Sequence, residues 1–263
     1  MSASAALQQA AELIRRAVHA VALTGAGIST PSGIPDFRSA GSGLWNQVDP
    51  LEVATIWAFY EHPEKFYRWI RPIARKLKDA QPNAAHRALA ELELHNLLHA
   101  VLTQNVDSLH QRAGSRRVIE LHGHARSATC LSCGHQLAAD ALWMDVLAGR
   151  LPEACPRCGG LLKPDVILFG EPLPYDALRA AQQEALTCDL MLVIGTSLEV
   201  MPAADLPLLA RRRGARLILI NRDPTPYDAA MEIVIRADVA RALAELTHAV
   251  LAEQSMDLAR VHG

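Results

Sequence analysis

The chain has 263 residues, enough for one large domain or two smaller ones. Half of the residues are hydrophobic and the formal net charge at pH 7 is -2. A packed core is therefore expected, whereas nucleic-acid binding, which needs surplus positive charge, is not. The beginning of the chain lacks the pattern of a signal peptide, and no apolar run approaches the roughly 20 residues of a membrane span. These features predict a soluble, cytoplasmic protein with no membrane association.

Helical and apolar segments alternate along most of the chain. Leu7, Ala11, Ile14 and Val18 recur at helical spacing near the start, and Asn83 is a candidate helix cap. Further helical patterns fall at 175–187, 203–213 and 238–254. Apolar runs typical of buried strands lie at 20–24, 101–103, 118–121, 189–195 and 216–221. This alternation predicts an α/β fold with a doubly wound parallel sheet.

Two stretches interrupt the alternation. Residues 41–79 are helical, aromatic and punctuated by proline, and residues 125–160 contain the paired cysteines. We interpret both as insertions that form a smaller lobe, beside a nucleotide-binding lobe made of residues 1–40, 80–124 and 161–263. A cleft between two lobes is a common place for a ligand.

The cysteine spacing predicts a metal site. Cys130 and Cys133 form one CxxC pair, and Cys155 and Cys158 form another, with glycines close behind each pair. Two such pairs complete the tetrahedron of a zinc ion and leave no position for water, so the zinc is expected to be structural. A disulfide or redox role is the alternative. Cys188 stands alone before an apolar run and is interpreted as a small buried hydrophobe.

A glycine-rich loop follows the first predicted strand. The loop GAGIST at 25–30 lets the backbone approach phosphates, but Thr30 stands where the usual dinucleotide fingerprint has its third glycine. Alone, this loop is explained as well by a tight turn. Small or polar residues also follow three other predicted strands, at 103–107, at 195–197 and at Asn221. Because ligands bind beyond the carboxyl ends of parallel strands, a nucleotide site is predicted there.

Taken together, these motifs resemble the sirtuin family. The resemblance rests on GAGIST at 25–30, GIPDFR at 33–38, TQNVDSLH at 103–110, ELHG at 120–123, the two CxxC pairs, KPDVILFGE at 163–171 and GTSLEVMPA at 195–203. It implies a Rossmann-like lobe with an inserted zinc lobe. It also implies an NAD-dependent protein-lysine deacylase, which consumes NAD and releases free lysine, nicotinamide and O-acyl-ADP-ribose. The implied partners are acyl-lysine proteins.

The resemblance also implies roles for individual residues. His122 matches the general base, and Asn105 and Asp107 match the residues that orient the nicotinamide amide; a turn or helix cap is the structural alternative for this pair. The implied NAD contacts are Gly25, Ala26, Gly27, Ile28, Ser29, Thr30, Phe37, Arg38, Gln104, Asn105, Val106, Asp107, Gly195, Thr196, Ser197, Asn221 and Val239. The implied substrate contacts are Tyr67 and the segment Ile167, Leu168, Phe169 and Gly170, for which an ordinary core strand is the alternative.

One departure from the family bears on the acyl group. Members that prefer negatively charged acyl groups carry Tyr-x-x-Arg in the helical insertion. Here Tyr67 is present, but Ile70 stands in the arginine's place and Arg71 points about 100° away on a helix. Because a buried carboxylate without a partner is unfavourable, acetyl or longer neutral acyl groups are predicted over succinyl.

Other functions fit parts of the pattern. ADP-ribosyl transfer to protein, or NAD hydrolysis, would use the same scaffold, but His122 favours deacylation. A zinc-ribbon binding module would leave the nucleotide motifs unexplained. A hydride-transferring dehydrogenase is disfavoured by the incomplete glycine fingerprint.

Overall fold

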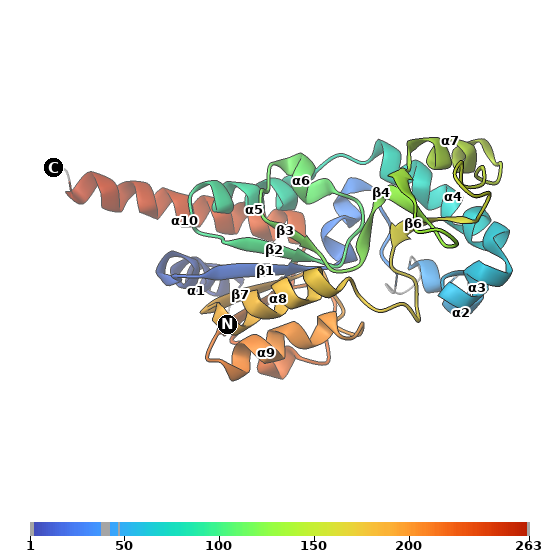
Figure 1. Ribbon diagram of the computed structural model, residues 1–263. Helices are drawn as coiled ribbons and strands as arrows, with labels where there is room; N and C mark the ends of the chain where they lie inside the picture. Colours follow the sequence, from blue (N-terminus) through green and yellow to red (C-terminus); the bar gives the residue numbers. More distant parts are fainter. Residues whose placement is uncertain (1–2, 38–42, 47, 262–263) are drawn as a thin grey trace.

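The computed structural model describes residues 3–37, 43–46 and 48–261, and its large sheet is built from the predicted apolar strands (Figure 1). The sheet has six strands in the order β3-β2-β1-β7-β8-β9, and every pairing in it is parallel. Its strands are β1 (Ala20–Thr24), β2 (Ala100–Thr103), β3 (Val118–Glu120), β7 (Leu190–Ile194), β8 (Arg216–Ile220) and β9 (Ile233–Ile235). The strand order reverses between β1 and β7, which is where doubly wound sheets bind ligands.

Helices cover both faces of this sheet. One face carries α1 (Ala3–Arg16), α5 (Ala84–Leu94) and α10 (Val239–Val261) over one apolar core. The other face carries α8 (Tyr175–Thr187) and α9 (Leu206–Arg212) over a second core. The short helix α6 (Leu109–Ala113) and the 3-10 turns η1 (Ala26–Ile28), η2 (Thr30–Ser32), η4 (Ala203–Asp205) and η5 (Asp228–Ala230) occupy the connections. The doubly wound α/β fold is thereby confirmed.

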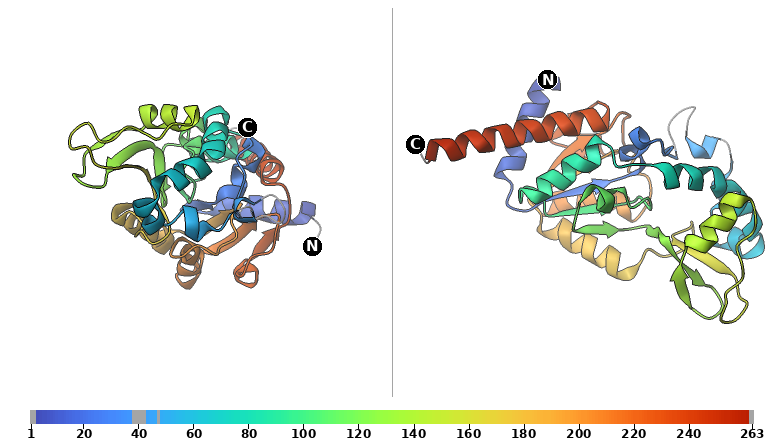
Figure 2. Two further views of the ribbon diagram at one scale, coloured as in Figure 1. Left: turned by 90° about the vertical axis from the view of Figure 1, so that its right-hand side faces the viewer. Right: turned by 90° about the horizontal axis from the view of Figure 1, so that it is seen from above.

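A third core, of a smaller region, lies beyond the carboxyl edge of the large sheet (Figure 2). It contains an antiparallel sheet in the order β5-β4-β6, made of β4 (Gly123–Cys130), β5 (Gln136–Ala138) and β6 (Leu162–Val166). The helices of this region are α2 (Pro50–Val53), α3 (Ile56–Glu61), α4 (Pro63–Asp79) and α7 (Asp140–Ala148), preceded by the 3-10 turn η3 (Leu44–Asn46). Phe59 and Phe66 from the helical segment pack with Ala128 and Leu162 from the small sheet, so the two predicted insertions share one core.

One local prediction needs correction. The first helix ends at Arg16, and Val18 is 94% exposed because the chain turns there to enter β1. The core-strand alternative for residues 167–170 does not hold, since β6 ends at Val166 and the following residues leave the small sheet. No helix in the described ranges is long and apolar enough to cross a membrane.

Candidate active site

Three glycines bring the loop after β1 against the loop after β7. The amide of Gly27 donates to the carbonyl oxygen of Gly195 over 2.8 Å. A Cβ on Gly25 would lie 2.7 Å from Cβ of Thr196, and one on Gly27 would lie 2.8 Å from the Gly195 oxygen. Gly195 itself has φ of +59°, a conformation that L-residues rarely adopt. The glycine loop is therefore explained by close backbone packing at the switch point as well as by room for phosphates.

Gln104 connects the end of β2 to the same place. Its amide donates to the carbonyl oxygen of Thr24, and its side-chain Nε2 donates to Oγ1 of Thr196 over 3.0 Å. Oγ1 of Thr196 also accepts from the amide of Leu198. The carboxyl ends of β1, β2 and β7 are thus joined by hydrogen bonds, and Gly25, Gln104, Gly195 and Thr196 meet at one point.

A buried polar cluster lies beneath the glycine loop and is centred on Ser29. Oγ of Ser29 donates to Oδ2 of Asp107 over 2.6 Å and accepts from Nδ2 of Asn105 over 3.0 Å. Asp107 also accepts from the amide of Leu109, where it stabilises the start of α6. Burial raises the pKa of Asp107, against the effect of its hydrogen bonds. Asn105 and Asp107, which follow β2, are therefore held together on one side of the loop.

Two histidines in this cluster were missed by the sequence analysis. Nε2 of His86 lies 3.4 Å from Oγ of Ser29, and Nε2 of His110 lies 3.0 Å from Oγ1 of Thr24. The two rings contact edge to face with their centroids 4.9 Å apart. Burial, together with the nearby Arg87, lowers the pKa of His86 to about 4. Burial, together with His86, lowers the pKa of His110 to about 3, so both imidazoles are neutral near pH 7.

His122 lies just after β3, at the junction with the small sheet. Nδ1 of its ring is 3.0 Å from the carbonyl oxygen of Gln104, which can only accept, so Nδ1 carries the proton. Nε2 is therefore the acceptor; it is out of contact with solvent and has no hydrogen-bond partner among the described residues. Burial lowers the pKa of His122, although the hydrogen bond to Gln104 acts in the opposite direction. The ring is a neutral base with a free lone pair, as general-base chemistry requires.

Aromatic rings extend from the nucleotide loop to the smaller core. Phe37 stacks on Trp45 with centroids 5.1 Å apart, and Trp45 stacks on Trp69 at 5.3 Å. Trp45 also meets the ring of Phe169 at 6.0 Å. Trp45 therefore lies between Phe37, predicted to contact NAD, and Phe169, predicted to contact the substrate. Arg38 lies outside the described residues.

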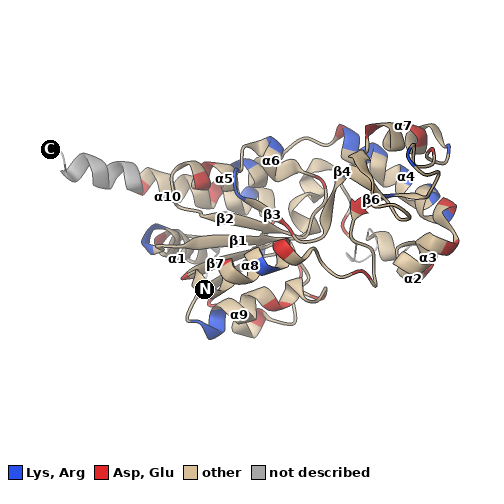
Figure 3. Cartoon of the chain, in the orientation of Figure 1, with Lys and Arg blue, Asp and Glu red and all other residues tan. Residues whose placement is uncertain are grey.

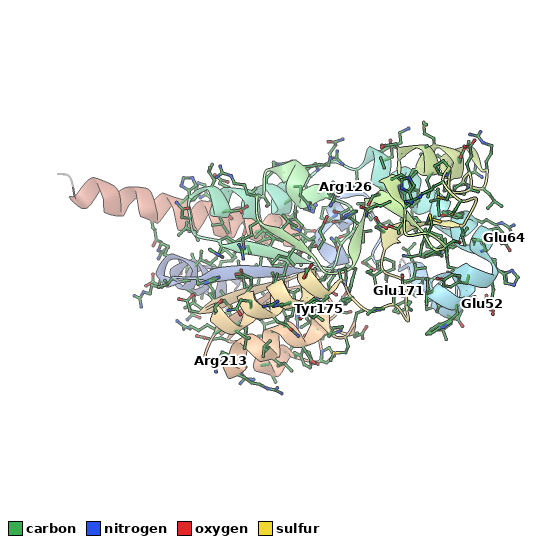
Figure 4. All side chains as sticks on the ribbon, in the orientation of Figure 1. Glu52, Glu64, Arg126, Glu171, Tyr175 and Arg213 are labelled. Carbon is green, nitrogen blue, oxygen red and sulfur yellow. The ribbon has the colours of Figure 1, made fainter. Side chains whose placement is uncertain are left out.

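The segment after β6 is fixed by hydrogen bonds on both sides. The amide of Ile167 donates to the carbonyl oxygen of His122, and the amide of Phe169 donates to that of Ala54. Glu171, labelled in Figure 4 beside the end of β6, accepts from the amide of Leu168 and pairs with the buried Nζ of Lys163 at 3.0 Å.

The same segment borders a hollow in the surface. A cavity of about 630 Å³ lies between α8 and the small sheet, and Ile167, Glu171 and His124 are among the residues that line it. None of the glycine-loop residues lines this cavity, so it is distinct from the nucleotide edge.

The four paired cysteines converge as predicted. Sγ of Cys130 lies 3.5 Å from Sγ of Cys158, and Sγ of Cys133 lies 3.8 Å from Sγ of Cys155. Thiolates placed 2.3 Å from a tetrahedral zinc ion are about 3.8 Å apart, so the four sulfurs fit one zinc ion. All five cysteines are free of disulfides.

Cys188 is buried, and burial raises the pKa of its thiol to about 12, in keeping with a small apolar side chain.

The Sir2 family model matches residues 25–202. The chain belongs to the Sir2 family. It is 45% identical over 236 residues to NAD-dependent protein deacetylase 2 of Caldanaerobacter subterraneus, covering 90% of this chain and 92% of the relative. It is 44% identical to NAD-dependent protein deacylase 2 of Archaeoglobus fulgidus, covering 93% and 96%. A solved structure, described as the structural basis for the mechanism and regulation of Sir2 enzymes, matches this chain with a TM-score of 0.89 at 43% identity. The match covers 95% of this chain and 99% of the solved chain.

Structures of related sirtuins carry bound ligands. One contains a p53 peptide with NAD+ and matches with a TM-score of 0.82 at 40% identity, over 93% of this chain and 97% of that one. Another is Sir2Af2 bound to a myristoylated histone peptide, with a TM-score of 0.82 at 38% identity, over 96% and 99%. The sirtuin fold predicted from the motifs is confirmed, and NAD and one zinc ion are the cofactors that fit this chain.

The other residues with predicted NAD roles follow strands of the large sheet. Asn221 follows β8, and its Nδ2 donates to the carbonyl oxygen of Asp223. Val239 is buried at the start of α10, and Ser197 is half-buried after β7. Ala26, Ile28, Thr30 and Val106 lie within or below the glycine loop and the loop after β2. Their NAD contacts stay predictions.

Tyr67 lies in a setting that argues for a structural role. Its hydroxyl donates to the carbonyl oxygen of Leu162 over 2.8 Å, and its ring packs edge to face against Phe59 and Phe66. Only 3% of the residue is exposed, and burial raises the pKa of its hydroxyl well above the usual value. A substrate contact by Tyr67 stays a prediction, and it would compete with this existing hydrogen bond.

Charges of both signs are spread over the two parts of the molecule (Figure 3). Several of the charged side chains form pairs at the surface, such as Arg241 with Glu245 and Arg16 with Glu12. Exposed pairs of this kind contribute little to stability.

Proposed function

We propose that this sirtuin removes acetyl or other neutral acyl groups from protein lysines, with NAD as a stoichiometric cosubstrate. The observation that carries the proposal is the ring of His122, which has a fixed tautomer, a lowered pKa and a buried Nε2 without a partner. When bound, NAD supplies an electrophilic ribose and nicotinamide as the leaving group. His122 would take a proton at Nε2 and return it later, while Gln104 holds Nδ1–H in place.

The other residues of the site would bind and orient. The backbone of the glycine loop and Gly195 offers close approach to phosphates, and Thr196 offers a hydroxyl beside them. Asn105 and Asp107 present an amide and a carboxyl group that suit a carboxamide. Their positions are fixed by Ser29 rather than by the ligand, so this geometry is preorganised.

The acyl-lysine is proposed to enter beside Phe169 and Ile167, with the substrate backbone adding as a strand along residues 167–170. Because the amides of Ile167 and Phe169 already donate within the chain, the substrate strand would use the remaining backbone groups, such as those of Gly170. Gly170 has φ of +88°, and a Cβ there would lie 2.4 Å from the ring of Trp57. A glycine is therefore needed for the segment to take this path.

The surroundings of α4 support a neutral acyl group. Ile70 packs against the smaller core, and the guanidinium of Arg71 lies against Gly149 at the end of α7. Because its guanidinium lies against Gly149, we expect that Arg71 would not neutralise a carboxylate in the acyl chain. We further propose that residues 41–79 and 125–160, together with β6 of the small sheet, act as a lobe separate from the large sheet, and that the protein works in the cytoplasm.

The direct test mixes the purified protein with NAD and an acetyl-lysine peptide and follows nicotinamide, peptide mass and acyl-ADP-ribose together. Equal amounts of the three products, and their loss in His122→Ala, are expected. A succinyl-lysine peptide run in parallel is expected to react more slowly. Nicotinamide release without peptide deacylation would contradict the proposal and point to ADP-ribosyl transfer or NAD hydrolysis.

A further inference from the structure

A separate group of metal-ligating side chains lies at the opposite edge of the large sheet. His19 and His99 directly precede β1 and β2, which are parallel neighbours, so both begin at the amino edge of the sheet, far from the small core (Figure 1). Glu184 reaches the same place from the last turn of α8. Nε2 of His19 is 2.8 Å from Oε2 of Glu184, and the two imidazole rings are 4.2 Å apart. One ligand atom from each of the three residues lies within 4.8 Å of the others.

The carboxylate of Glu184 is buried and fixed in position by its partners. Its side chain is only 4% exposed, and its second oxygen pairs with the guanidinium of Arg117, the residue before β3. Burial acts to raise the pKa of Glu184, but the hydrogen bonds from His19 and Arg117 lower it overall. Asp189, the residue before β7, adds a second carboxylate to this edge and accepts from the amides of Val18 and His19.

A plain ion pair does not account for the whole group. Arg117 already balances the charge of Glu184, and that pair does not need His99. His99 nevertheless packs its ring against that of His19, with the two rings tilted by 53°. Two imidazoles beside a buried carboxylate, with one ligand atom of each within 4.8 Å of the others, form a set of side chains that transition metals bind.

We propose that His19, His99 and Glu184 bind a divalent transition-metal ion, with Zn²⁺ as the ion of choice. Two imidazole nitrogens and one carboxylate oxygen are a known zinc ligand set, whereas Mg²⁺ and Ca²⁺ prefer oxygen ligands. The metal would lie between His19 and Glu184, in place of their direct contact. Arg117 stays on the other carboxylate oxygen and orients it, as outer-sphere partners do.

The geometry requires only a small adjustment. Ligands about 2.0–2.1 Å from a tetrahedral ion lie about 3.3 Å from one another. His19 and Glu184 are already closer than this, and His99 is exposed, so its ring is free to turn toward them. With three protein ligands the site keeps a position for water, and its metal should exchange more readily than one held by four cysteines.

A metal ion bound here would stabilise the folded protein and would take no part in catalysis. It connects α8 to the starts of β1 and β2, and the length of the strands separates it from His122. Binding to the folded state alone raises the melting temperature as the free metal concentration rises.

The test counts zinc in the purified full chain. After a mild chelator wash that leaves the four-cysteine zinc in place, the protein is dialysed against free Zn²⁺ in the micromolar range and measured by mass spectrometry of the metal. We expect two zinc ions per chain in the wild type, and a dissociation constant for the second ion that is at least tenfold higher in His99→Gln. His248→Gln, which changes an exposed histidine on α10, is the matched control and should keep both ions.

A second measurement does not depend on stoichiometry. Co²⁺ bound at this site should give visible absorption bands without the intense thiolate band expected from the cysteine site, and His99→Gln should lose them. Zinc should raise the melting temperature of the wild type and of His248→Gln but not of His99→Gln. A single zinc ion per wild-type chain, or equal second-ion affinity in the two variants, would overturn the proposal.

Discussion

Nδ1 of His122 lies 3.0 Å from the carbonyl oxygen of Gln104, and this hydrogen bond decides which nitrogen of the ring can act as a base. The carbonyl oxygen cannot donate, so the proton is on Nδ1 and the lone pair is on Nε2. Gln104 also spans from β1 to Thr196. The backbone that orients the base therefore belongs to a residue whose side chain holds two strand ends together.

Replacement of His122 by alanine should abolish most of the activity without unfolding the protein. Removal of a general base lowers the rate by about 10²–10⁴-fold. The change should appear in kcat for deacylation, measured from peptide mass, while the melting temperature falls only modestly, because the one hydrogen bond that the ring makes runs from Nδ1 to the carbonyl oxygen of Gln104. Equal rates in the wild type and His122→Ala would assign the base to another group.

The pH profile should reflect the lowered pKa of His122. Because burial favours the neutral imidazole, the base stays available until the pH falls below the ordinary histidine value of 6.5. The acid limb of kcat/KM should therefore have its midpoint below 6.5, and activity should be lost only as the pH falls through it. An acid limb centred above 6.5 would show that the pKa is raised in the working enzyme.

The strands of the large sheet could be predicted within about a residue because they are buried on both faces and read as continuous apolar runs. β9 (Ile233–Ile235) was not predicted, since three residues give too short a run to distinguish from a loop. The small sheet was not predicted as strands either. Its strand β5 is largely exposed, and a fold that relies on bound zinc carries a weaker hydrophobic signal.

The residues of the site that belong to sequence motifs could be predicted, and the others could not. The strand-end residues were found because parallel strands bring their carboxyl ends together. His86 and His110 were missed because their partners, Ser29 and Thr24, are 57 and 86 residues away in sequence. One signal was present: His86 stands three residues after the helix cap Asn83, where its side chain completes a capping box.

Gly195→Ala should weaken NAD binding. Gly195 has φ of +59°, and a Cβ there would lie 2.5 Å from the amide nitrogen of Ile28. The left-handed conformation costs an alanine about 1–2 kcal/mol, and the collision would displace the glycine loop. We expect the dissociation constant for NAD, measured by calorimetry, to rise roughly tenfold or more, since 1.4 kcal/mol is a factor of ten.

Gly33→Ala is the control for this prediction. Gly33 has φ of +86°, but no atom lies within 4 Å of a Cβ placed on it. The backbone strain is thus similar, and the collision is absent. If the two variants lose the same affinity for NAD, strain alone is responsible and the close approach of Gly195 to the loop has no role.

Loss of zinc should unfold the smaller core. Cys130 and Cys155 are buried in it, next to apolar side chains such as those of Phe66 and Leu162. Cys155→Ser should therefore release zinc, lower the melting temperature and reduce deacylation at least tenfold, because zinc binding supplies folding free energy. Cys188→Ala, which changes the cysteine between α8 and the start of β7, should retain zinc. Full activity in a zinc-free Cys155→Ser protein would contradict the structural role.

Acid should destabilise the fold through His86 and His110. In the folded protein their pKa values are about 4 and about 3, whereas in the unfolded chain they are near 6.5. Unfolding therefore takes up protons between these values, and the free energy of unfolding falls as the pH decreases through this window. Each histidine contributes a slope of up to about 1.4 kcal/mol per pH unit.

The variant His110→Asn separates this effect from general loss of stability. Asparagine keeps a polar side chain near Thr24 but takes up no proton on unfolding. The slope of unfolding free energy against pH, from urea titrations between pH 4 and 6.5, should therefore be smaller by up to about 1.4 kcal/mol per pH unit, whatever the absolute stability. His248→Asn, at an exposed position, should keep the wild-type slope. If His110→Asn also keeps the wild-type slope, His110 is protonated in the folded protein over this pH range. The prediction that His110 is neutral beneath the glycine loop would then be wrong.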